Sequence, residues 1–462
     1  MEPIKDTINI SVRNNTNLPQ TISILGGNQD PNGTPANTLA QWNIASETFF
    51  ASDWITIQAA PASNPTLVNY EVQLQSATIQ GVVAAINTLG IGVFQYSGST
   101  IYTANNLFVY GDLYIEARNT FISTWNTSLT SGGSSNANQV SLPLLPGGTY
   151  NFVVSWGDGT FDTITSWNQP EATHTYATPG IYTIQTTGQF EGIGFGVSND
   201  NLKLLNILSW GKIRLTSPGS QFFSGCTNLD LSQVSNVPDL SATTNLNNAF
   251  SNCTNITTIG RINEWNVSGI TQLQSTFLNS NFNDDISSWN TSSLLDMLNT
   301  FKNCPFNGQI NSWDVSNVTL MFGAFQNNTQ FNQPLDLWNV SGCTDMGYMF
   351  DGASSFNQPI NSWDVSNVQS MAYMFNSATA FNQDISGWNI VNVQQIQEFM
   401  GNKTYLDYSA TLLDAIYNSW STLPLTIPNV TSFGTIKYTA AGQAGKNILT
   451  GTYGWTITDG GI

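Results

Sequence analysis

Between residues 265 and 402 the hydrophobic positions recur with a period of 24 or 25 residues. A tryptophan opens each repeat, and the six copies are Trp265, Trp289, Trp313, Trp338, Trp363 and Trp388. Counted from the tryptophan, mostly aliphatic side chains recur at +2, +5 and +8, and an aromatic side chain or methionine recurs at +12. A fixed period of this length predicts stacked units that share one continuous core. We expect the tryptophans to form a core ladder, because exposed indoles in a row would create an aggregation-prone patch.

Two shorter periods alternate within each repeat. The Trp-x-Val step has the period of two that is typical of a strand, whereas +5, +8 and +12 have the spacing of one side of about two helical turns. We therefore predict a leucine-rich-repeat-like solenoid with one strand and one short helix per repeat. A polar loop such as 279–281 follows +12 and absorbs the difference between 24 and 25 residues.

The chain upstream of the repeats has the pattern of strands. Residues 119–200 alternate apolar and polar side chains between Gly, Asp and Pro turns, which indicates a β-sandwich. Residues 1–118 show the same alternation at 8–12, 54–57 and 70–74, with a predicted helix near Gln80–Leu89 and a hairpin at 93–102.

The predicted fold class is therefore mainly β and multidomain. We divide the chain into four parts on these patterns. They are a β-rich N-terminal domain (1–118), a β-sandwich (119–200), the repeat solenoid (201–402) and a C-terminal cap (403–462).

Charge is scarce and acidic. Only 9% of the 462 residues are charged, the net charge is −18, and no Lys or Arg occurs from Asn303 to Asn402. Such a surface cannot neutralise phosphates, so we expect neither nucleic-acid binding nor attraction to anionic membranes. No apolar stretch is long enough for membrane insertion, and the N-terminus shows no basic segment followed by an apolar run.

Chemically reactive side chains are few, and we predict no catalytic residue, cofactor or metal site. His174 is the only histidine, and we interpret it as a packing residue beside the turn at Asp158. Asp158 and Asp162 have the residue type of a calcium site or a catalytic carboxylate pair, but turn chemistry explains them more simply.

The four cysteines occupy small core positions of the repeats. Cys226, Cys253 and Cys304 share one repeat site, and Cys343 replaces a +5 valine. We interpret them as reduced structural thiols. A disulfide between Cys226 and Cys253, on adjacent repeats, remains an alternative. Zinc is disfavoured, because the chain has neither a CxxC pair nor a second histidine.

The motif Trp-Gly-Asp-Gly-Thr (156–160), with His-Thr-Tyr (174–176) and Pro-Gly-Ile-Tyr (179–182), resembles the polycystic-kidney-disease-type (PKD) β-sandwich. That resemblance implies an extracellular spacer or a domain that contacts carbohydrate or protein. The repeat lines Phe-Asn-Gln-Pro-Ile-Asn-Ser-Trp-Asp-Val-Ser-Asn-Val (356–368) and Met-Ala-Tyr-Met-Phe (371–375) resemble BspA-like leucine-rich-repeat surface proteins of bacteria, mycoplasmas and some viruses.

The two resemblances together cover roughly residues 120–462. In the BspA-like family a PKD-like domain often precedes the repeats, and the ending Tyr-Gly-Trp-Thr-Ile-Thr-Asp-Gly-Gly (453–461) resembles the family's terminal cap. They imply the architecture but not the ligand. Residues 1–118 resemble N-terminal segments of virion structural proteins of bacteriophages, with another β-rich surface module as the alternative.

A polar column directly follows the tryptophans and is the candidate ligand-facing ladder. Its members are Asn266, Asn290, Asp314, Asn339, Asp364 and Asn389. If the tryptophan and the +2 side chain point inward, this column points outward. It then either hydrogen-bonds a ligand or satisfies backbone groups of its own repeat, and we favour the structural role.

Three functions follow from these patterns. The first is a non-enzymatic virion surface or fibre-type protein whose residues 1–118 bind other virion structural proteins and whose remainder attaches to a host surface glycan or protein. The absence of a visible export signal favours it. The second is a secreted bacterial surface adhesin. The third is a glycan-active enzyme, which needs two carboxyls about 5–9.5 Å apart in a cleft. Homo-oligomerisation is compatible with each.

Overall fold

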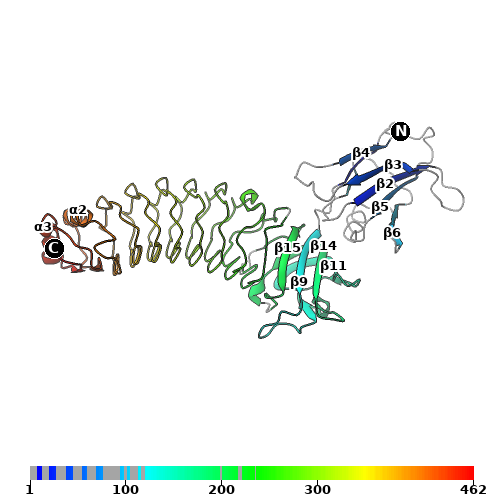
Figure 1. The fold of residues 1–462 in the computed structure, drawn as a ribbon, viewed down its shortest axis with the longest axis horizontal. Helices are drawn as coiled ribbons and strands as arrows, with labels where there is room; N and C mark the ends of the chain where they lie inside the picture. The colour runs from blue at the N-terminus through cyan, green and yellow to red at the C-terminus, as the bar shows by residue number, and fades with distance from the viewer. Residues whose placement is uncertain are drawn as a thin grey trace.

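The computed structural model describes the strands of the N-terminal part and residues 120–197, 200–216, 221–234 and 236–462. Figure 1 shows a sheet domain followed by a long row of coils that ends in two helices. The described chain is mostly β, with an antiparallel sheet domain and a periodic repeat region.

Among the described residues of the N-terminal part, eight strands form three small sheets. They are β1 (Ile8–Val12), β2 (Gln20–Gly27), β3 (Thr38–Ile44), β4 (Ile55–Ala59), β5 (Asn69–Gln75), β6 (Phe94–Ser97), β7 (Ile101–Ala104) and β8 (Leu113–Ile115). The orders are β4-β1-β8, β3-β2-β5 and β6-β7. The strands predicted at 8–12, 54–57 and 70–74 correspond to β1, β4 and β5, and the predicted hairpin is β6-β7. The predicted helix near Gln80–Leu89 lies outside the described residues.

The sheet domain contains seven strands and two short 3-10 helices. They are β9 (Thr120–Asn126), β10 (Gln139–Ser141), β11 (Leu144–Ser155), β12 (Phe161–Ile164), η2 (Pro170–Ala172), β13 (Thr173–Thr175), β14 (Ile181–Ile193), η3 (Phe195–Val197) and β15 (Leu204–Trp210). Five strands form an antiparallel sheet of order β12-β11-β14-β9-β15, and β10 pairs with β13. Alternate residues of β11, such as Phe152 and Val154, are buried, as strand periodicity requires.

Strand β15 joins the sheet domain to the repeats. It pairs with β9 on one side, and its Asn206 forms a parallel bridge with Asp230 in the first coil. The sheet thus extends past the predicted boundary at residue 200. One cluster of buried side chains runs without interruption from Phe121 to Trp455. The edge strand of the sheet therefore covers the first coil of the repeats.

Consecutive repeats lie side by side and are joined by single-residue parallel bridges at position +7. The bridges run through Gln272, Asp296, Leu320, Asp345, Ser370 and Gln395. In each of the four repeats that begin at Trp265, Trp289, Trp313 and Trp338, four backbone N–H groups, at +8, +10, +12 and +14, donate to carbonyls of the following repeat, and in the repeat of Trp363 the first three do so. In the repeat of Trp289, for example, Met297 N donates to Leu320 O (2.9 Å) and Asn303 N to Gln326 O (2.8 Å).

The predicted strand and helix of each repeat are both wrong. The bridge falls at +7 and not at Trp-x-Val, and the described residues 265–402 contain no helix. The segment after +8 instead forms successive turns with i to i+3 hydrogen bonds, such as Thr300 N to Met297 O (3.2 Å). Position +10 of every repeat, and position +14 of every repeat except the last, have positive φ, as the third residue of a type II turn requires. An α-helix cannot form, because alternate N–H groups donate to the next repeat and not to the residue four positions back.

The repeat core consists of aromatic rings stacked on their own copies. One column contains Phe223, Phe250, Phe277, Phe301, Phe325, Phe350 and Phe375, with consecutive centroids 5.6–5.8 Å apart. It begins two coils before Trp265, where the tryptophan pattern has not yet started. The η4 helix (Ile262–Glu264) lies directly before Trp265.

The six tryptophans lie inside the coils and are 1–4% exposed. Each of the last five donates its indole Nε1–H to a carbonyl of the preceding repeat, as Trp363 does to Leu335 O at 3.0 Å. Burial and this hydrogen bond together fix the ring orientation. The indoles are therefore not a surface for ligands.

The C-terminal cap closes the last repeat. It contains α2 (Ala410–Trp420), β16 (Val430–Ser432), α3 (Gln443–Gly451) and β17 (Thr456–Thr458), and β16 pairs with β17 in parallel. Met400 N, which lies at +12 of the last repeat, donates to Ser432 O in β16 (2.9 Å). Strand β16 therefore supplies an acceptor that a further repeat would otherwise provide.

Candidate functional site

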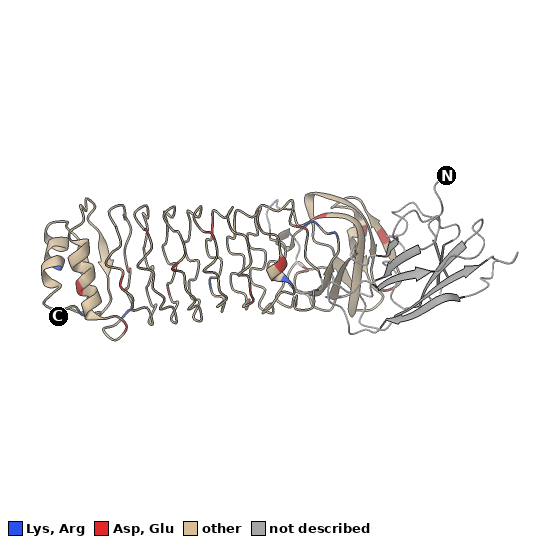
Figure 2. Ribbon diagram, turned by 90° about the horizontal axis from the view of Figure 1, so that it is seen from above, with Lys and Arg blue, Asp and Glu red and all other residues tan. Residues whose placement is uncertain are grey.

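The exterior of the repeats is long and carries little charge. Figure 2 shows only scattered acidic and basic positions along the coils. Lys403 adds no surface charge to the last repeat, because its side chain is only 1% exposed. Contacts on this exterior must therefore come from hydroxyls, amides, carboxylates and aromatic rings.

The candidate ladder at +1 lies on the outside, as alternation with the buried +2 position requires. All six side chains are exposed. Each accepts a hydrogen bond from the backbone N–H two residues later, and Asp314 Oδ1 also accepts from Ser316 Oγ at 2.6 Å. Hydrogen bonds from Ser316 and Ser366 hold the pKa of Asp314 and Asp364 below its usual range. The column thus caps a turn in its own repeat and leaves its remaining polar atoms toward solvent.

A second polar column, at −6, connects neighbouring repeats directly. Its members are Asn283, Asn307, Asn332, Asn357 and Asn382. Each side-chain oxygen accepts a backbone N–H from the next coil, at 2.8–3.0 Å. The hydrogen bonds of this column hold the coils together. From the sequence pattern alone, this column could not be distinguished in its role from the +1 column.

Sequence reasoning missed a group of aromatic rings on the outside. Phe322 at +9 and Tyr348 and Tyr373 at +10 are half-buried, and consecutive rings are 5.1 Å and 4.6 Å apart. The other repeats have Ser, Asn, Gly or Glu at +10. The change from a small polar residue to tyrosine at one repeat position was the signal available in the sequence.

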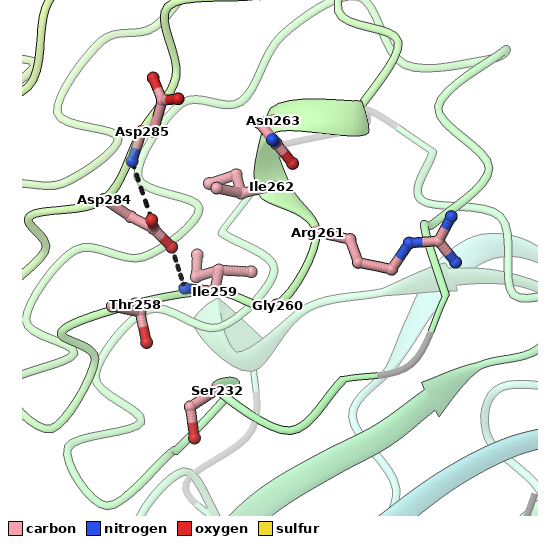
Figure 3. A pocket seen from close by; sticks show the side chains of 9 residues that line it. All are labelled: Ser232, Thr258, Ile259, Gly260, Arg261, Ile262, Asn263, Asp284 and Asp285. Carbon is pink, nitrogen blue, oxygen red and sulfur yellow. Dashed lines mark hydrogen bonds between the residues drawn. The ribbon is translucent and has the colours of Figure 1, made fainter. Parts of the chain in front are cut away.

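A hollow of about 280 Å³ lies where the first coils meet the regular repeats (Figure 3). Asp284 and Asp285 line it, together with backbone of Ile259 and Gly260. Both Asp284 oxygens accept backbone N–H groups, from Ile259 (3.0 Å) and Asp285 (2.8 Å). In Figure 3 the Asp285 carboxylate points away from that of Asp284, and Arg261 extends away from both.

The charged groups around this hollow are therefore engaged in local contacts. Arg261 binds Glu264 through two hydrogen bonds of 2.8 Å and 2.6 Å. Asp285 accepts from Ser287 N at 2.9 Å, and this bond lowers the pKa of its carboxyl. The arrangement contains no pair of a nucleophile and a general base of the kind that acyl transfer requires.

His174 is part of a packed cluster in the sheet domain. Its ring stacks on Trp156 with centroids 4.8 Å apart, and its Nε2 lies 2.8 Å from Asp158 Oδ2. Although burial acts to raise it, hydrogen bonds from Thr160 and His174 hold the pKa of Asp158 below its usual range. Asp162 Oδ2 accepts from the indole of Trp156 at 2.8 Å. These carboxylates thus have structural partners.

The four cysteines are buried and free, in agreement with the predicted reduced thiols. Burial raises the pKa of Cys253, Cys304 and Cys343 to about 12. A buried thiol with a raised pKa is a poor nucleophile, so these side chains act as small core residues.

Within the described residues no group of three or more His, Cys, Asp or Glu side chains has the arrangement of a metal site. Among the helices that the structure describes, none combines the length and apolar character needed to cross a bilayer.

Comparison with known families identifies the repeat pattern. Residues 219–307 and 295–411 each match the family model described as "Mycoplasma protein of unknown function, DUF285". The matched segments cover the stacked coils with their regular aromatic columns, from just before Phe223 to just after Lys403. No curated protein and no solved structure matches the chain.

Proposed function

From the repeat family matched at residues 219–411, we propose that this chain is a non-enzymatic attachment protein that binds its partner over the outer face of the repeats. One observation carries the proposal. The interior is filled by stacked rings, whereas the exterior presents continuous columns of amides and hydroxyls with no Lys or Arg from Asn303 to Asn402. A regular, charge-poor face favours recognition by many neutral hydrogen bonds over a broad area.

The partner that fits this exterior is a host surface glycan or a neutral face of a protein. Both supply hydrogen-bond donors and acceptors without requiring a cation on this side. Nucleic acid does not fit, because its phosphates need Lys or Arg for neutralisation.

We also propose an architecture finer than the sheet domain and the periodic region. The stacked coils support a solenoid of the BspA-like leucine-rich-repeat type, with turns in place of the helix of each repeat. The five-stranded sheet with the β10-β13 pair, and the cluster of Trp156, Asp158 and His174, support a PKD-like sandwich.

Two settings are compatible with attachment, the virion surface and the bacterial cell surface. On a virion, residues 1–118 would bind other structural proteins of the particle. The description of the matched family names Mycoplasma and thus favours the bacterial setting. Immunogold labelling of purified particles and of intact cells from the source culture separates the two, because the label follows only one of them.

The test of attachment is binding of the full chain to host cells and to immobilised glycans at several salt concentrations. We expect saturable binding that changes less than twofold between 0.05 and 0.5 M salt, because few charges are available for screening. Absence of binding to every surface would overturn the proposal. So would release of new reducing ends from a bound glycan, which would show hydrolysis.

A further inference from the structure

We propose that Phe322, Tyr348 and Tyr373, here called the aromatic ridge, form the binding site for a neutral oligosaccharide. The inference rests on the proposed attachment function and assigns it a place and a ligand class. The ridge crosses three consecutive repeats in the middle of the row of coils.

The backbone gives the first argument. Position +10 has positive φ in every repeat, with 58° at both Tyr348 and Tyr373, against 53° at Asn299 and 61° at Gly323. Glycine and asparagine tolerate this conformation, whereas a bulky side chain is disfavoured there. The turn itself does not need an aromatic side chain, because Ser275, Asn299, Gly323 and Glu398 hold the same position in other repeats, and the two tyrosines occupy strained positions that the fold does not explain. Strained residues of this kind concentrate at functional sites.

One repeat has its ring at +9 and glycine at +10, and the next repeat has glycine at +9 and its ring at +10, so that the rings form one row. The repeat with Phe322 has Gly323 after it, and the repeat with Tyr348 has Gly347 before it. Tyr348 and Tyr373 stack with centroids 4.6 Å apart and an angle of 12° between their planes. The row therefore continues from +9 to +10 across a repeat boundary.

Gly347 allows close packing in the middle of this row. A Cβ at this residue would lie 3.1 Å from the Phe322 ring, 3.1 Å from Asp345 Oδ1 and 3.2 Å from Ser370 Oγ, which is tighter than ordinary contact, and Asp345 Oδ1 accepts from Gly347 N at 2.8 Å. The missing side chain thus lets an aromatic edge, a carboxylate and a hydroxyl lie beside one another at the ridge. Placing apolar surface beside a few directed polar groups is how ligand sites gain both affinity and orientation.

Polar groups also border the other side of the ridge. Asp351 accepts from Gln326 Nε2 and Asn376 Nδ2, each at 2.8 Å, across three repeats. Burial, with the neighbouring Tyr373 and Asp351, raises the pKa of Tyr348, and the Tyr348 hydroxyl can donate a hydrogen bond. The site thus offers ring surface near the Asp351 carboxylate and the side-chain amides of Gln326 and Asn376.

This combination fits a neutral sugar better than other ligands. A pyranose has an apolar C–H face that packs on aromatic surface and hydroxyls that both donate and accept hydrogen bonds. Asp345 and Asp351 lie on the two sides, and no Lys or Arg occurs from Asn303 to Asn402. Sulfated, phosphorylated or uronic acid-rich glycans would be repelled.

The decisive variant is the pair Tyr348→Asn and Tyr373→Asn in the full chain. Asparagine already occupies the same turn position at Asn299 with φ of 53°, so the backbone keeps its conformation while both rings are lost. Tyr348→Phe retains the ring and removes only the hydroxyl. Leu337→Ala is the matched control, because Leu337 is an apolar side chain that is 72% exposed at a different repeat position.

Affinity electrophoresis in gels containing galactomannan, xyloglucan, β-glucan, desialylated mucin or hyaluronan measures the effect. We expect retardation of the unaltered chain by at least one neutral polymer and none by hyaluronan. The double variant should bind at least tenfold more weakly, Tyr348→Phe about twofold to fivefold more weakly, and Leu337→Ala unchanged. Circular dichroism melting should be unchanged or slightly raised in the double variant.

Several results would overturn the inference. Unchanged retardation of the double variant would place the sugar elsewhere and leave the attachment function intact. Retardation of the unaltered chain by hyaluronan alone would exclude a neutral sugar at the ridge. So would binding of the unaltered chain to a protein array that the double variant loses, if the unaltered chain binds no glycan. If the chain binds host cells but the double variant binds them equally, the inference fails and the proposed function stands. Absence of cell and glycan binding together would overturn both.

Discussion

The sheet domain and the repeat region pack aromatic residues differently. In the sheet domain the angle between paired rings varies from pair to pair, as in Phe121–Phe190 at 86° and Phe152–Phe190 at 20°. In the repeats, copies of one residue lie nearly parallel, as in Trp363–Trp388 at 3°. A repeat meets its neighbour after a near translation, so equal side chains face each other. A non-repeating core instead packs each ring against a different neighbour.

The two regions also differ in how they hold a buried lysine. Lys203 in the sheet domain lies 3.5 Å from Asp200 and donates to Ser135, Asn136 and Gln139. Lys403 at the end of the repeats donates to backbone carbonyls of Ala378 (2.5 Å) and Thr379 (3.3 Å). A buried ammonium without a paired carboxylate pays a larger desolvation cost, and this difference can be measured.

The largest expected effect is that of removing a buried tryptophan, which should cause local unfolding in the repeats and global unfolding in the sheet domain. Trp363→Ala and Trp156→Ala should each cost about 3–5 kcal/mol, because both remove a buried indole and leave a void. In the repeats the damage should stay within neighbouring coils, whereas in the sheet domain the whole sheet should open. Denaturant titration with hydrogen-exchange mass spectrometry measures both. A cost below about 1 kcal/mol for Trp363→Ala would contradict the buried ladder.

The second effect concerns pH. Burial lowers the pKa of Lys403 to about 8, from 10.5. Between these values unfolding makes Lys403 take up a proton, so Lys403 itself should contribute about 2 kcal/mol more stability at pH 9.5 than at pH 7. The buried cysteines, whose pKa is raised, act in the opposite direction in every variant, so the Lys403 contribution is measured as a difference between chains. The change in stability from pH 7 to pH 9.5 should be about 2 kcal/mol less favourable in Lys403→Met than in the unaltered chain, whereas Lys302→Met, a half-buried control, should match the unaltered chain. The comparison is made by denaturant titration at both pH values, and an equal change in all three chains would refute it.

The third effect compares contacts between and within repeats. Asn332 Oδ1 accepts from Asn357 N and Gln358 Nε2, each at 2.9 Å, in the next coil. Asn332→Ala should therefore cost about 1–2 kcal/mol, because two donors lose their partner. A thermal melt that matches the unaltered chain would show that water replaces both contacts.

The smallest effect belongs to the +1 column. Asp364 accepts from Ser366 N within its own repeat at 3.0 Å, so Asp364→Ala should change the free energy of unfolding by about 0.5 kcal/mol or less. The same melt measures it. A loss as large as that of Asn332→Ala would mean that the exposed column also holds neighbouring coils together.

The sequence was sufficient to predict the period, the inward tryptophans and the strands of the sheet domain, because burial repeats at a spacing that can be read directly. It was insufficient for the path between +8 and +14. The spacing of three then four there arises from successive turns, which share that periodicity with a helix. The distinguishing signs were Ser, Asn and Gly at +14 of every repeat and at +10 of the first three repeats, because Asn and Gly tolerate positive φ.

The candidate site was predictable only in part. The outward direction of the +1 column followed from alternation, but its hydrogen bonds within the turn did not. The coils at Phe223 and Phe250 lack the tryptophan, so in the sequence only the repeat site shared by Cys226 and Cys253 marked them as repeats. The ridge depends on contacts between different repeats, at +9 in one and +10 in the next, and a single-repeat alignment does not show them.

The backbone amides that each repeat donates to its successor give the row of coils a direction. One end of any such stack presents carbonyls, and the other, C-terminal end presents N–H groups. At the C-terminal end, strand β16 accepts a hydrogen bond from Met400 N as another coil would. A whole repeat can therefore be duplicated or deleted without redesigning either terminus. The length of the row of coils, and so the distance that such a protein spans, is thus set by the number of repeats.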